Sequence, residues 1–124
     1  MPRVNVKYKF VKDAFIDFIK LIEFQGKKAD FQNDYIGDNQ YEGKVENVSV
    51  MDQIEIEIEV AGVTDAECTL EASIVKIRKT GTNDDGSPKY SEVGETKQIV
   101  GLPIHLKVLN NSIYYVKKHT IKWV

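Results

Sequence analysis

Three glutamates occupy alternate positions in the stretch DQIEIEIEV, residues 52–60, and they form the most regular set of potentially reactive side chains in the sequence. Because side chains of an extended strand alternate between its two faces, Glu55, Glu57 and Glu59 are expected to share one face at intervals of about 6.8 Å. This spacing is too wide for neighbouring carboxylates to share a proton. It is also too regular for a metal cage, which needs ligands that converge from different elements. The row therefore predicts a surface for charge pairing and no catalytic or metal-binding site.

Charge is segregated along the chain although the net charge is only −2. Residues 42–71 carry nine acidic side chains and one lysine, whereas residues 96–124 carry five lysines and no acid. An acidic and a basic face on one small domain can meet between copies, so we expect a homo-oligomer with the three glutamates in its contact. The alternative is a solvated strand face crossed by lysines of a neighbouring strand. The candidates for that pairing are Lys7, Lys9, Lys117 and Lys118.

The C-terminal stretch IYYVKKHTIKWV combines aromatic rings with cationic groups. Rings stack on bases and ammonium groups bind phosphate, so this chemistry suits a small anionic ligand such as a nucleotide. A terminal strand with a buried tryptophan has the same composition, and the acidic half of the chain would repel a polyanion, so we do not expect nucleic acid binding. Together with the turn-rich segment 80–94, the candidate ligand or partner residues are Asn83, Asp85, Tyr90, His105, Tyr114, Tyr115, Lys117, Lys118, His119 and Trp123.

Other motifs that carry chemistry are weak in this sequence. The stretch GTNDDGS, residues 81–87, lacks the alternating ligands and the distant glutamate of a calcium loop. Cys68 is the only cysteine, which excludes an internal disulfide and a cysteine-rich zinc site, and we expect it to be buried as a small apolar residue. There is no phosphate-binding loop and no nucleophile elbow. We therefore expect no enzyme activity, no cofactor and no metal.

Two functional hypotheses remain from the sequence. The first is a non-catalytic binding or assembly protein that acts through homo-oligomerisation and a partner surface, as small accessory or virion-type proteins do. The alternative is a protein that binds or sequesters a small, nucleotide-like anion. We find no signal peptide and no apolar run long enough for a membrane-spanning helix, so a cytoplasmic protein without membrane contact is expected.

At 124 residues, the chain is predicted to form a single domain, residues 1–124. Residues 3–10 alternate like a strand, whereas KDAFIDFIKLIEFQG, residues 12–26, has apolar residues at intervals of three and four that predict an amphipathic helix. Asp13 fits the start of this helix and Gly26 the position after its end. Further strands are predicted at 42–50, 52–60, 67–79 with a bulge near 73–75, 95–109 with a break at Pro103, and 113–123.

The expected fold class is therefore α+β, with one amphipathic helix packed on an antiparallel β-sheet meander of five or six strands that can curl into a barrel-like shape. This order resembles the ground plan of cystatin-like folds and of small ring-forming barrels with one helix. The predicted core consists of Val6, Tyr8, Phe15, Phe18, Ile22, Ile54, Ile56, Ile58, Leu70, Ile74, Ile77, Leu106 and Ile121.

Overall fold

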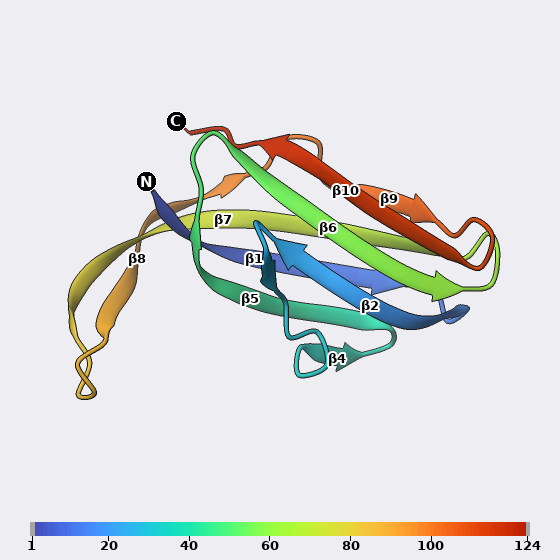
Figure 1. Ribbon diagram of the computed structural model, residues 1–124, viewed down its shortest axis with the longest axis horizontal. Coiled ribbons are helices and arrows are strands. Elements are labelled where there is room, and N and C mark those ends of the chain that lie inside the picture. Colours follow the sequence, from blue (N-terminus) through green and yellow to red (C-terminus); the bar gives the residue numbers. More distant parts are fainter. Residues whose placement is uncertain (1, 124) are drawn as a thin grey trace.

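The computed structural model describes residues 2–123, which form two antiparallel β-sheets packed face to face (Figure 1). The strands are β1 (Arg3–Lys12), β2 (Ile16–Phe24), β3 (Lys27–Lys28), β4 (Tyr35–Gly37), β5 (Gln40–Ser49), β6 (Gln53–Gly62), β7 (Glu67–Thr82), β8 (Pro88–Gln98), β9 (Ile104–Lys107) and β10 (Ser112–Thr120). Sheet A has the order β4-β5-β1-β7-β8, and β9 also pairs with β7. Sheet B has the order β10-β6-β2-β3.

The core lies between the two sheets, and in β1 and β6 its apolar residues alternate with residues on the outer face. In β1 the residues Val4, Val6, Tyr8 and Phe10 are buried, and in β6 every second residue from Ile54 to Val60 is buried. A buried side chain of this size stabilises the fold by about 1.5–3 kcal/mol relative to an exposed one. The alternation therefore fixes which face of each sheet points inward.

The expected helix at residues 12–26 is wrong, because Ile16–Phe24 form strand β2 and residues 2–123 contain no helix. The pairing of β2 with β6 shifts between Ile16 and Phe18 and again between Ile19 and Leu21. Each irregularity changes which face the next residue occupies, so the buried residues stand at positions 16, 19, 22 and 24. These intervals of three imitate the period of a helix.

The α+β fold class is therefore corrected to an all-β sandwich. Ten strands are present in residues 2–123 where five or six were expected, and they form two sheets rather than one barrel-like sheet. Two predicted core residues are also wrong, because Phe15 is 64% and Phe18 is 57% exposed. The other predicted core residues are buried: Val6, Tyr8, Ile22, Ile54, Ile56, Ile58, Leu70, Ile74, Ile77, Leu106 and Ile121.

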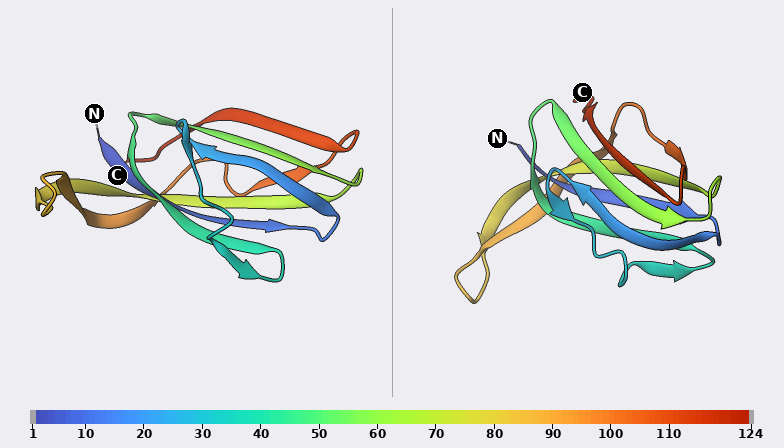
Figure 2. Two further views of the ribbon diagram at one scale, coloured as in Figure 1. Left: turned by 60° about the horizontal axis from the view of Figure 1, so that its bottom comes forward. Right: turned by 45° about the vertical axis from the view of Figure 1, so that its right-hand side comes forward.

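A long hairpin of β7 and β8 extends past one end of the sandwich, as both views of Figure 2 show. The expected bulge near residues 73–75 is wrong, because β7 pairs with β1 without interruption from Cys68 to Ile77 and the extra residues lie on β8, between Val93 and Lys97. The turn-rich segment 80–94, predicted as a loop or a hairpin tip, is a hairpin whose turn lies at residues 83–87. We call the part of this hairpin from Lys76 to Val93 the arm.

The two long sides of the sandwich differ. On one side β3 lies against β5, and the Lys27 ammonium group donates to the carbonyl oxygen of Asn47 at 2.5 Å. On the other side β10 pairs only with β6, and β8 pairs only with β7, among the described strands. A bridge between Ile99 and Ile121 joins the two sheets there. Within residues 2–123 the fold offers no helix that could cross a membrane.

Candidate functional site

The glutamate row lies on the outer face of sheet B, on its central strand β6. Glu55, Glu57 and Glu59 point away from the core, while the intervening isoleucines are fully buried. In the register of β10 with β6, the residues opposite the row are Lys118, Val116 and Tyr114, respectively. On the other side, β2 places Leu21 opposite Glu59 and Glu23 opposite Glu57.

Lysines compensate this row only in part. The Lys20 ammonium group lies 3.1 Å from a carboxylate oxygen of Glu59, and Lys118 is the cross-strand neighbour of Glu55. Glu57 has Val116 on one side and the like-charged Glu23 on the other. Directly opposed like charges destabilise a sheet, so the middle of the row is the position at which a further cation would gain most.

Exposed apolar side chains border the row. Phe18 on β2 is 57% exposed, while Tyr114 and Val116 on β10 are 55% and 47% exposed. Partial loss of water raises the pKa of Tyr114, and the negative charges of the row add to this effect. Exposed aromatic groups are enriched at protein interfaces whereas glutamate is depleted there, so the apolar border is the part of this surface that resembles an interface.

The ten candidate ligand residues do not meet in one place. Asn83 and Asp85 lie in the turn of the arm and Tyr90 on its second strand, at the opposite end of the molecule from β9 (Figure 1). His105 is exposed on β9, where its Nδ1 lies 3.1 Å from the Thr69 hydroxyl. The side chains of β10 divide between the two faces of sheet B, with Tyr114 and Lys118 on the outer face.

His119 and Tyr115 do come together, on the inner side of β10. His119 is buried, and its Nδ1 donates to the carbonyl oxygen of Val100 at 2.9 Å, since a carbonyl only accepts. In the neutral imidazole Nε2 then accepts from the Tyr115 hydroxyl at 2.7 Å. Gly101 beside this pair has a φ of +90°, which side-chain-bearing residues rarely adopt, and a Cβ there would also lie close to Nδ1, at 3.1 Å. With all its polar atoms paired, His119 ties β10 to the segment that follows β8.

The remaining candidates on the C-terminal segment are placed separately. Trp123 donates its indole N–H to the carbonyl oxygen of Met51 at 2.8 Å, and the Lys76 ammonium group lies 4.8 Å from the centre of its ring. Lys117 is exposed near the open edge of sheet B. Cys68 is buried, and burial raises the pKa of its thiol to about 12, which removes it as a nucleophile.

A second site is formed by the arm and the outer face of sheet A. Residues of the arm and outward-facing residues of β1 and β5 line an open hollow of about 590 Å³. Two of the candidate ligand residues, Asn83 and Tyr90, line this hollow together with Lys44 and Lys89. The hollow therefore brings together two of the three candidate ligand residues of the hairpin, whereas Asp85 does not line it.

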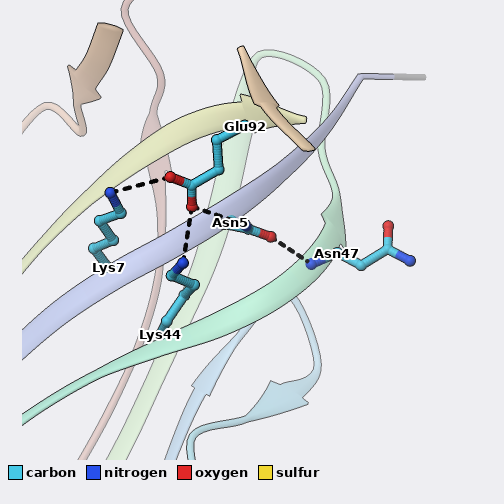
Figure 3. Close-up of polar contacts among 5 residues, drawn as sticks. All are labelled: Asn5, Lys7, Lys44, Asn47 and Glu92. Atoms are coloured by element: carbon cyan, nitrogen blue, oxygen red, sulfur yellow. Dashed lines mark hydrogen bonds and ion pairs between the residues drawn. The ribbon is translucent and has the colours of Figure 1, made fainter. Parts of the chain in front are cut away.

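Glu92 holds the base of the arm against sheet A, as Figure 3 shows. Its carboxylate lies 3.3 Å from the ammonium group of Lys7 and 3.0 Å from that of Lys44, and it accepts a hydrogen bond of 2.9 Å from the Asn5 amide. The Asn5 oxygen in turn accepts from the backbone N–H of Asn47 at 3.0 Å. We refer to Glu92 with Asn5, Lys7 and Lys44 as the Glu92 clamp.

The clamp was not found from the sequence. Its hydrogen bonds, first that of Asn5 and then those of Lys44 and Lys7, hold the pKa of Glu92 at about 2. Asn5 and Glu92 are 87 positions apart, and the segment around Glu92 has the composition of a loop. Asn5 gave no signal in the sequence, because it occupies a polar position in the regular alternation of β1; its side chain is buried at the irregularity between β1 and β5.

Comparison of the chain with protein-family models, with curated proteins and with solved structures found no match. The functional proposals below therefore rest on the geometry of the two surfaces just described.

Proposed function

We propose that this protein is a non-catalytic assembly protein that self-associates through the outer face of sheet B. The observation that carries the proposal is the incompletely compensated glutamate row, bordered on both sides by exposed apolar side chains. The apolar groups supply area to bury, while the carboxylates determine the register and orientation of the partner. In this role the row carries no chemistry of its own.

The charge arrangement favours a cationic surface as the partner of this face. Glu57 lies between Val116 and Glu23, so the binding of a cation there relieves a repulsion that exists in the isolated chain. Salt screens the attraction between solvent-exposed charges, and the screening length is about 10 Å at 0.1 M ionic strength. Self-association through this face is therefore expected to weaken as the salt concentration rises.

The test replaces Glu55, Glu57 and Glu59 together by glutamine and measures molecular mass by light scattering over a range of concentrations at low and high salt. The variant should keep the fold, because surface charge pairs each contribute at most about 1 kcal/mol. We expect it to associate more weakly than the wild type at low salt and equally at high salt. The matched control replaces Glu42, Glu71 and Glu95, which lie on sheet A and change the net charge equally. Equal association of both variants and the wild type at every salt concentration would refute the proposal.

The hollow beneath the arm supports a second candidate, the binding of a small anionic ligand. It brings Asn83 and Tyr90 next to Lys44 and Lys89, which combine a ring, an amide and two cations. A thermal-shift screen with nucleotides tests this candidate, because a ligand at 100 times its dissociation constant adds about 2.7 kcal/mol of stability. Loss of an observed shift in Tyr90→Ala would place the ligand in the hollow, and the absence of any shift would remove this candidate.

A further inference from the structure

The arm presents a basic face that matches the glutamate row. Lys76 and Arg78 stand two residues apart on β7, so they share a face of the strand. That face continues the core-facing side of β7, on which Ile74 is fully buried, beyond the end of the sandwich. Residues 76–82 contain no carboxylate. The cross-strand partners on β8 are also uncharged, because Val93 pairs with Lys76 and Ser91 with Arg78.

We infer that the Lys76–Arg78 face of the arm binds the glutamate row of a second copy of this chain. This inference rests on the proposed function, which identifies the row as an interface, and it names the surface that occupies it. Lys76 and Arg78 repeat at the same interval of about 6.8 Å as neighbouring glutamates of the row. Two cations can therefore approach two carboxylates at once, with Val93 facing the apolar border of the row.

The contact must form between copies because the arm extends past the end of the sandwich, away from the strands that carry the row of its own chain. Glu92, on the other face of the arm, meets Lys7 and Lys44, which point outward from sheet A, so Lys76 and Arg78 point toward the side of sheet B. The row points outward from sheet B, on the far side of the core. In both views of Figure 2 the arm extends away from β6 and β10. A contact of this kind uses different surfaces on its two members, so it closes into a two-fold dimer where both copies exchange arms, and otherwise into a ring or a filament.

Two features hold the basic face in position. The Lys76 ammonium group lies over the ring of Trp123 at 4.8 Å, and the hydroxyl groups of Thr80 and Ser91 are 3.0 Å apart across the arm. The Glu92 clamp fixes the base of the arm on the opposite face. The arm is therefore oriented before it meets a partner, which lowers the entropic cost of binding.

Reciprocal charge exchange tests the inference. One variant carries Glu55→Lys, Glu57→Lys and Glu59→Lys, and the other carries Lys76→Glu and Arg78→Glu. Each alone should associate at least about tenfold more weakly than the wild type at low salt, because like charges then meet at the contact. A mixture of the two variants in equal amounts should recover association, since each supplies the surface complementary to that of the other. Light scattering and sedimentation velocity measure both effects.

Two controls keep the test decisive. Lys107→Glu with Lys122→Glu changes the charge equally on the lysine-rich C-terminal segment and should leave association unchanged. Arg78→Glu alone, which leaves the contact of Lys76 with Trp123 intact, should still weaken association if the double variant folds poorly. A monomeric wild type at all concentrations would refute the proposed function itself. Weakening by the row variant without weakening by the arm variants, and without recovery on mixing, would keep the proposed function and overturn the arm as the partner.

Discussion

The Glu92 carboxylate compensates the repulsion between two lysines that face each other on sheet A. Lys7 and Lys44 are directly opposite each other on β1 and β5, where two like charges repel. The Glu92 carboxylate, brought from β8, lies within 3.3 Å of both ammonium groups. The same carboxylate accepts from the Asn5 amide, so one side chain joins three strands. The clamp therefore attaches the base of the arm to the outer face of sheet A.

Replacement of Glu92 by glutamine should lower the free energy of unfolding by about 1 kcal/mol at neutral pH, a value reduced for the partial exposure of the clamp. A glutamate ordinarily titrates near pH 4.5, and the clamp holds the pKa of Glu92 at about 2. A depressed pKa in the folded state gives stability that is present above the unfolded pKa and is lost as the pH falls through the folded one. The difference from the wild type should therefore be constant above about pH 5 and shrink toward about pH 2.

Urea denaturation of the wild type and Glu92→Gln at several pH values measures this difference. Glu95→Gln is the matched control, because Glu95 lies on the same strand and has no ion pair within residues 2–123. A difference that grows toward acid pH would contradict the assigned role of Glu92.

At the scale of the element, strand β2 shows how bulges can give a strand the apolar spacing of a helix. The side chains of Ile16, Ile19 and Ile22 are β-branched and favour a strand, yet their intervals of three are those of a helix. The spacing misled the prediction because two register shifts change the alternation of the strand. In β6 the alternation is uninterrupted, and there the sequence correctly predicts both the strand and the face of the glutamate row.

The Glu92 clamp and the hollow beside it could not be predicted from local sequence patterns. The clamp joins positions that approach one another only after β1, β5, β7 and β8 have paired. No periodicity in the segment around Glu92 encodes these pairings. Asn83 and Tyr90 were selected for their chemistry, and their common place in the hollow follows from the bend of the arm.

Two neighbouring residues of β2 distinguish the strand from a helix experimentally. Ile19→Ala should destabilise the protein by about 2–4 kcal/mol, because the side chain is buried and its loss leaves a cavity. Phe18→Ala should cost less than about 1 kcal/mol, because this ring is exposed on the outer face of sheet B. Urea denaturation of both variants measures these values. A large cost for Phe18→Ala with a small one for Ile19→Ala would contradict the strand.

At the scale of the whole molecule, the arm proposed to mediate association is separate from the core that stabilises the fold. All the buried hydrophobic residues lie outside residues 78–91, so the outer arm adds nothing to the core. The cations of the arm instead lie beyond the end of the sandwich, away from the strands that carry the glutamate row. The proposed contact therefore uses two separate surfaces of one chain, neither of which belongs to the core.

This division predicts the outcome of shortening the arm. Replacing residues 78–91 by Asn-Gly joins Ile77 to its partner Glu92 through a two-residue turn and keeps the clamp. The shortened chain should unfold with a free energy within about 1 kcal/mol of the wild type, since no core contact is lost, and should no longer self-associate. A control that replaces only residues 83–87 by Asn-Gly retains Lys76 and Arg78 and should associate normally. Urea denaturation and light scattering measure the two properties separately. Undiminished association of the long deletion would show that the arm is not the contact, and failure of that deletion to fold would show that the arm belongs to the fold.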